Sequence, residues 1–330
     1  MKTSWMGFRS PFADGIQRFL AHKRALGRRF DSEEKTLRLF DRYLVEQKVG
    51  TASQVTPRLI EAFLASRPLR RPRSYNLHLC TVRRLFDWLV AQGFLDRSPV
   101  EARPHRKTSQ RIPFIFDLPA AQGLLKTARS LEDNSKAPMR GRTYHAIFAI
   151  LYGLGLRVGE VCRLSISDVD LERRLLVIRE TKFYKRRLVP FGPRMDELVR
   201  EHLDAKSQRM GNPSPQAPLF SFTRRGEIHP CTVSQTFRQL VPRLGLHVRP
   251  GCSPPRLHDL RHSFAVGTLL RWYRSGVDPG AGLLRLATFL GHGDVTSTAV
   301  YLTITAELFQ EANRRFEAFA RHVVAEGPLP

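Results

Sequence analysis

The chain has 330 residues, 42% of them hydrophobic, and its 54 lysines and arginines outnumber its 30 aspartates and glutamates, for a formal net charge of +24. This length suits two domains better than one core, and so large a positive charge favours a polyanionic partner. No apolar run is long enough to span a membrane, no signal-type leader is visible, and the four cysteines lack metal-site spacing. We therefore expect a cytoplasmic protein with no metal and no membrane contact.

The N-terminal region, residues 1–98, is predicted to be a helical domain. Apolar residues recur at helical spacing in four segments, at about 12–28, 32–48, 57–66 and 74–93. The loop between the third and fourth segments is broken by prolines and carries Arg70, Arg71 and Arg73. Arginines gathered in a loop are candidate contacts to a nucleic-acid backbone.

Residues 99–113 are predicted to be a linker, because three prolines interrupt any helix there. The basic residues of this linker include Arg106 and Lys107, which are further candidates for binding a DNA backbone. A solvated connector with no binding role explains the same residues equally well.

Residues 114–330 are predicted to form a second, mixed domain. A short β pattern at 175–179 and 187–190 predicts a hairpin. The fold class is therefore mainly α with a small β-hairpin or sheet, in two domains that clamp one partner. Helical patterns surround the hairpin at about 118–130, 143–155, 193–208, 231–244, 258–275, 282–290 and 305–324.

Two basic signals precede the middle of this domain. Arg157 follows an apolar helix and a glycine-rich turn, and a guanidinium matches a phosphate with two hydrogen bonds. Lys182 lies in the turn of the hairpin, where a lysine could donate a proton to a leaving oxygen. Lys185 and Arg186 lie beside it and are further candidate contacts to DNA. Because Lys185 is so near, the choice of lysine stays open, and an ordinary basic surface explains all three.

Three further signals follow. His258 and Arg261 are three residues apart on a predicted helix and share a face. His292 lies between two glycines after another apolar helix, and Tyr301 comes nine residues later. A tyrosine hydroxyl can act as a covalent nucleophile when a base and cations surround it. Each signal alone is also explained by a helix cap or a core side chain.

Taken together, this order of arginine, lysine, His-x-x-Arg, Leu-Gly-His and tyrosine resembles the tyrosine recombinases, or phage integrases. The resemblance covers the chain from about Leu118 to Glu317, and the helical N-terminal domain is similar to the family's core-binding (SAM-like) domain. The segments Leu269 to Gly276 and Leu302 to Phe319 resemble members carried by transposons and genomic islands. The resemblance implies a bacterial, nucleoid-associated enzyme that integrates or transposes a mobile element.

The resemblance also implies roles. Tyr301 would attack the scissile phosphate and form a 3′-phosphotyrosyl link, while Arg157 and Arg261 stabilise the transition state and Lys182 protonates the leaving 5′ oxygen. His258 would handle the tyrosine proton, His292 would hydrogen-bond a non-bridging oxygen, and Glu160 would orient the cluster from behind. This chemistry needs no cofactor and no metal.

The implied partner is double-stranded DNA, bound by a homo-tetramer on synapsed sites, with related recombinases as possible companions. The apolar stripe in residues 305–324 predicts a helix that docks on its own domain or on a neighbouring protomer. A type IB topoisomerase, a catalytically silent DNA-binding protein and an RNA-binding protein remain the alternatives.

Overall fold

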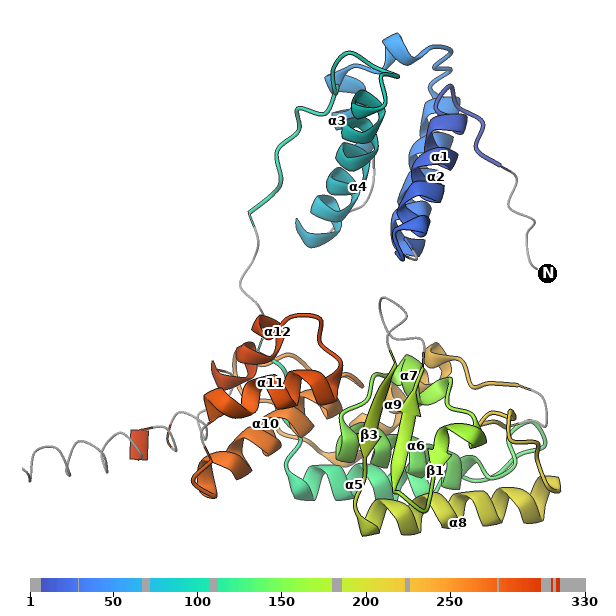
Figure 1. Cartoon of the computed structure of the whole chain (residues 1–330), viewed down its shortest axis with the longest axis vertical. Helices are drawn as coiled ribbons and strands as arrows, with labels where there is room; N and C mark the ends of the chain where they lie inside the picture. Colours follow the sequence, from blue (N-terminus) through green and yellow to red (C-terminus); the bar gives the residue numbers. More distant parts are fainter. Residues whose placement is uncertain are drawn as a thin grey trace, which may run out of the picture. The chain divides into compact units, whose positions relative to one another are not determined.

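The computed structural model describes residues 7–28, 30–66, 72–106, 112–179, 186–222, 226–277, 279–303, 310 and 313–314. The chain divides into two compact units, residues 1–110 and 111–330, and each is described by itself. Figure 1 shows the helices of the first unit and the mixed second unit.

The first unit is helical, as predicted. Its core is built around aromatic rings in edge-to-face contact, with Phe40 against both Phe63 and Phe86. These rings come from three different helices and are fully buried, so they hold the unit together through apolar burial. Its helices are α1 (Ala13–Ala25), α2 (Asp31–Glu46), α3 (Pro57–Ala65) and α4 (Pro72–Ala91), with a 3₁₀ turn at Ala52–Gln54.

The start of the predicted linker packs on this unit. Ala102 is buried in its core and Val100 packs against the same cluster. The Asn76 side chain, on α4, accepts a hydrogen bond from the His105 amide and donates one to the His105 carbonyl, each 2.8 Å long. The chain up to His105 therefore belongs to the helical unit rather than to a free connector.

The second unit is arranged around one helix, α6 (Arg140–Leu154), which is buried on most sides and contacts α5 (Leu118–Arg129), α8 (Pro193–Met210) and α10 (Asp259–Arg274). A helix that is apolar around most of its circumference is typical of a core helix. The remaining helices are α7 (Val158–Cys162), α9 (Pro230–Leu240), α11 (Pro279–Leu290) and α12 (Thr296–Ala299), with 3₁₀ turns at Ile166–Asp168, Val241–Leu244 and Val300–Thr303.

The second unit also contains a three-stranded antiparallel sheet (Figure 1), in the order β1 (Val169–Asp170), β2 (Leu175–Ile178) and β3 (Arg187–Pro190). The predicted hairpin and the mainly helical fold class are thus confirmed. Strand β1 and helix α7 were not predicted, because two and five residues are too short to show a period. The tail helix predicted at 305–324 lies almost wholly outside the described residues.

Candidate active site

The chain turns sharply after α6 and so delivers Arg157. Gly155 ends the helix with φ +61°, a conformation that favours glycine. A Cβ atom there would lie only 2.5 Å from Cδ1 of Phe264, on α10. Because only glycine fits this approach, the turn brings the carbonyl of Gly155 within 2.7 Å of Nη1 of Arg261. The glycine-rich turn therefore positions both arginines of the predicted cluster.

Glu160 connects two arginines in the interior. Its carboxylate accepts two hydrogen bonds from Arg187, at 3.0 and 2.9 Å, and one of 2.8 Å from Nη1 of Arg157. The Glu160 side chain is 3% exposed. Burial alone would raise its pKa, but the hydrogen bonds and charge of Arg187, with those of Arg157, lower it to about 2. The carboxylate is therefore ionised and fixes both guanidinium groups.

The C-terminal end of α11 holds three arginines. Helix ends leave carbonyl groups without intrahelical partners, and these carry partial negative charge. Here three consecutive carbonyls accept guanidinium hydrogen bonds: Phe289 from Arg187 at 2.9 Å, Leu290 from Arg261 at 2.8 Å, and Gly291 from Arg157 at 2.9 Å.

Arg261 and Tyr301 are both buried, at 1% and 3% exposure. Burial, with repulsion from Arg157, lowers the pKa of Arg261 to about 10, so it stays protonated at neutral pH. Burial, the larger effect, raises the pKa of Tyr301 above its usual value, although Arg261 and Arg157 act to lower it. Two fixed cations thus face the tyrosine, as stabilising a phenolate or a transferred phosphate requires.

His262 is the direct partner of the tyrosine hydroxyl, with 3.0 Å between its Nδ1 and the Tyr301 oxygen. The other ring nitrogen, Nε2, lies 4.0 Å from Oδ1 of Asp259, whose side chain is fully buried. Burial, with the charges of Arg256 and Arg261, lowers the pKa of His262 to about 4, so the ring is neutral at pH 7. With its proton on Nε2, toward the carboxylate, Nδ1 is free to accept from the tyrosine.

His292 is a second histidine near the tyrosine. Its ring is nearly parallel to that of Tyr301, with centroids 6.3 Å apart, and its Nδ1 lies 2.7 Å from the hydroxyl of the buried Thr298. Burial and the charges of Arg261 and Arg157 lower its pKa to about 4. A neutral imidazole in a fixed orientation can donate one hydrogen bond to an anionic group.

The structure therefore brings together five of the residues singled out by sequence: Arg157, Glu160, Arg261, His292 and Tyr301. His258, directly before α10, borders the same cluster: its ring centroid lies 4.7 Å from that of His262. Its side chain reaches the surface, but burial of its ring, with the charges of His262 and Arg261, lowers its pKa to about 4. Among the proposed DNA contacts, Arg73, Arg106 and Arg186 are exposed. Five of the predicted site residues lie outside the described residues: Arg70, Arg71, Lys107, Lys182 and Lys185.

Sequence reasoning assigned no role to two residues of the cluster, His262 and Arg187. His262 lies one helical turn after His258, so its spacing placed it on the same face. Arg187 lies two residues before Val189, which is buried, so strand alternation placed its side chain inward. A charged residue on the inner face of a strand was the signal available. Among the described residues, no group of three or more His, Cys, Asp or Glu side chains could hold a metal ion.

The fold and this cluster define the class: an enzyme with a buried tyrosine held among arginines and histidines that could bind a phosphate. The pattern that describes the phage integrase family matches residues 121–307. The chain is 31% identical to the integrase/recombinase y4rB of Sinorhizobium fredii over 310 residues, covering 93% of this chain and 98% of the relative. It is 29% identical to the tyrosine recombinase XerC of Pelobacter propionicus over 275 residues, 82% of each chain.

Two solved structures share the fold. The Tn1549 transposon integrase in complex with transposon right end DNA is 16% identical, with a TM-score of 0.63, and the match covers 93% of this chain and 99% of that one. A lambda integrase tetramer bound to a Holliday junction is 19% identical, with a TM-score of 0.61, over 87% and 76% of the chains. The chain belongs to the phage integrase family and is a tyrosine recombinase, a DNA strand transferase. No helix among the described residues is long and apolar enough to cross a membrane.

Proposed function

We propose that this chain is a site-specific recombinase that cuts and rejoins DNA in the integration or transposition of a mobile element. The observation that carries the proposal is the Tyr301 hydroxyl, buried beside Arg261 and hydrogen-bonded to His262. The similarity to y4rB, named an integrase/recombinase, and the fold shared with a transposon integrase support the mobile-element role.

In the cleavage step, the Tyr301 oxygen attacks the scissile phosphorus while its proton passes to Nδ1 of His262. The bond from phosphorus to the 5′ oxygen breaks, and Lys182 gives that oxygen a proton. The product is a 3′-phosphotyrosyl link and a free 5′ hydroxyl, so the phosphodiester energy is conserved. This assigns the tyrosine proton to His262, whereas the family resemblance had implied His258.

The arginines would bind the phosphate that the tyrosine attacks. Arg157 and Arg261 are held by Glu160, by Gly155 and by the end of α11, so they need not reorganise when charge develops on the phosphorane. His292 would donate a hydrogen bond to a non-bridging oxygen. Glu160 acts only through the arginines and is a positioning residue.

Binding to double-stranded DNA would use basic residues of both units. Arg73, Arg106 and Arg186 are exposed and carry no carboxylate partner in the described chain. Arg70, Arg71, Lys107 and Lys185 are proposed to join them. The working form would be a homo-tetramer on synapsed DNA, in which the segment 305–324 docks on a neighbouring protomer.

A second candidate function is resolution of chromosome multimers, which the 29% identity to XerC favours. Deleting the gene separates the two. Loss of the excised or circular form of the flanking element supports mobility, whereas accumulation of chromosome dimers supports resolution. A type IB topoisomerase would instead relax supercoiled DNA that lacks any specific site.

The direct test uses nicked suicide duplexes cut from the DNA that flanks the gene. Wild-type protein should form a covalent complex that survives denaturing electrophoresis, and Tyr301→Phe should bind the same duplex without forming it. A covalent complex trapped by Tyr301→Phe would overturn the assignment of the nucleophile. Relaxation of plasmids without flanking sequence by the wild type would favour the topoisomerase.

A further inference from the structure

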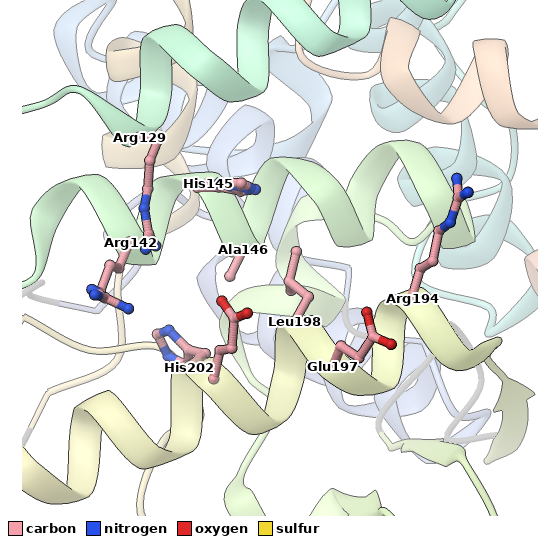
Figure 2. Close-up of a pocket in the computed structure, with 9 residues that line it drawn as sticks. Arg129, Arg142, His145, Ala146, Arg194, Glu197, Leu198 and His202 are labelled. Atoms are coloured by element: carbon pink, nitrogen blue, oxygen red, sulfur yellow. The ribbon is translucent and has the colours of Figure 1, made fainter.

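The second unit contains a pocket between α5, α6 and α8 (Figure 2), with a volume of about 270 Å³. It is lined from the first half of α6, whereas Arg157 follows the other end of that helix. The nine residues from Ala146 to Leu154, the remainder of α6, lie between the two sites and span about 13 Å at about 1.5 Å per residue. The pocket is therefore separate from the tyrosine cluster.

Two arginines at one end of the pocket form no direct ion pair with a carboxylate of the described residues. The side chains of Arg129, on α5, and Arg142, on α6, make no hydrogen bond or ion pair with any described residue, and Figure 2 shows them side by side. Partial burial, together with the charge of Arg142, lowers the pKa of Arg129. In contrast to the arginines near Tyr301, these two guanidinium groups repel each other, and Glu201 acts on Arg129 without forming an ion pair with it.

A buried imidazole faces the same charges. His202 is 5% exposed, and its Nε2 lies 3.1 Å from the carbonyl oxygen of Leu219. Since a carbonyl only accepts, the ring proton is on Nε2 and Nδ1 carries a lone pair. That Nδ1 is buried without a hydrogen-bond partner, and so is Nδ1 of the neighbouring His145. An unpaired buried polar atom costs free energy, so these two atoms need an explanation.

The potential around His202 is positive. Lys206, one turn along α8, is 3% exposed and bonds to the carbonyl of Pro218 and to the hydroxyl of Ser221 rather than to a carboxylate. Burial first, and then the charges of Lys206, Arg142 and Arg129, lower the pKa of His202 to about 4. Glu201 acts against this potential, since it raises the pKa of Arg129 and of His145. Arg194 and Glu197 line the other end of the pocket (Figure 2).

We propose that this pocket binds a tetrahedral oxyanion of the phosphate class, held by Arg129 and Arg142, and that His202 takes up a proton on Nδ1 when the anion binds. Guanidinium groups that form no direct ion pair favour an anion rather than a cation. A neutral donor would satisfy Nδ1 but leave the two arginines unpaired. A metal ion is disfavoured by the same positive charges, and no metal-binding cluster is present among the described residues.

The test measures anion binding by the full-length protein in calorimetric titrations with inorganic phosphate against a chloride background of equal ionic strength. Because the tyrosine cluster is also proposed to bind a phosphate, Arg157→Gln serves as the matched control. Binding that persists in Arg157→Gln, and weakens about tenfold or more in Arg142→Gln and Arg129→Gln, supports the pocket. Both pocket arginines are exposed, so their variants should melt as the wild type does. Unchanged phosphate binding in the two pocket variants would overturn the proposal.

Proton uptake is tested with sulfate, whose charge does not change between pH 5 and 8. In the Arg157→Gln background, sulfate should bind more tightly as the pH falls, and heats in two buffers of different ionisation enthalpy should show uptake of close to one proton. His202→Gln keeps an amide donor for the Leu219 carbonyl and removes Nδ1, so it should abolish this pH dependence. A pH dependence that is the same in His202→Gln would refute the role of His202.

Two sources of phosphate are distinguished by DNA binding. If the ligand is a free phosphate or phosphate monoester, Arg129→Gln and Arg142→Gln leave the salt dependence of DNA binding unchanged. If it is a DNA backbone phosphate, the double variant lowers the slope of log K against log salt by about 2.

Discussion

Each of the two units contains a network of one glutamate and two arginines, and the two networks differ in burial. In the first unit, Glu34 pairs with Arg24 and Arg38 where all three side chains are partly exposed, at 20%, 47% and 24%. In the second unit, Glu160 pairs with Arg187 at 3% and 9% exposure, and Arg261 is almost fully buried. A glutamate–arginine network is thus partly exposed in one unit and buried in the other.

The difference fits the roles proposed for the two units in binding and cleaving DNA. Exposed arginines lose little by staying in water and can neutralise a backbone phosphate when DNA arrives. A transition state on phosphorus needs cations that are already oriented, so the second unit holds them with Glu160 and with the carbonyls of α11. Buried charges are costly, and here each is matched by a named acceptor.

The largest effect is expected for His262. Replacing it by Asn keeps a hydrogen-bonding group near Tyr301 but removes the base, and should slow cleavage about 10²–10⁴-fold without weakening DNA binding. Cleavage of a suicide duplex should also rise with pH between 7 and 9 in this variant, because only hydroxide would then ionise the tyrosine, whereas the wild type stays flat.

His258→Asn is the matched control, one helical turn away. It should retain the pH profile of the wild type. A steep pH profile in His258→Asn and a flat one in His262→Asn would restore the proton to His258.

The next largest effect is a loss of stability, which we expect to differ between substitutions of Glu160 and Glu34. Glu160→Gln leaves Arg187 buried without a counterion and should destabilise the protein by about 3–5 kcal/mol, with loss of cleavage. Glu34→Gln breaks a partly exposed pair and should cost at most about 1 kcal/mol. Urea unfolding of the full chain measures both. Equal losses in the two variants would mean that burial does not distinguish the two networks.

Acid should destabilise the second unit through its neutral imidazoles. The pKa of His262 and of His292 is about 4 in the folded protein, against about 6.5 in an unfolded chain. The unfolded state therefore binds more protons between these values, and stability is lost as the pH falls from 6.5 toward 4, by about 1–3 kcal/mol for each ring.

Urea midpoints from pH 7 to pH 4.5 measure this loss, which should be smaller in His292→Asn because one of the two rings is gone. An identical pH dependence in His292→Asn and the wild type would show that this ring does not titrate in the expected window.

The smallest effect is expected at the surface of the first unit. Arg73→Gln and Arg106→Gln should each lower the slope of log K against log salt for DNA binding by about 0.9, with no change in stability. Fluorescence anisotropy with a labelled duplex measures the slope. Asp14→Asn, which removes an exposed carboxylate of the same unit, is the control and should not lower it.

The sequence by itself determined the helical first unit, the hairpin and five members of the tyrosine cluster, because helical and strand periods and the order of motifs are local properties. The sequence also showed the glycine-rich turn, but it did not show why glycine is needed there. Gly155 is required because Phe264, on α10, lies within 2.5 Å of where its Cβ would be.

Only the tertiary structure decided which histidine bonds to Tyr301 and which arginine bonds to Glu160. His258 and His262 share a helical face, and the choice between them depends on where the turn at Val300–Thr303 places the tyrosine. Arg187 reaches Glu160 across 27 residues, and the end of α11 reaches Arg157 across 134. Contacts at such separations are set by how α6, α10 and α11 pack, and no local period in the sequence records that packing.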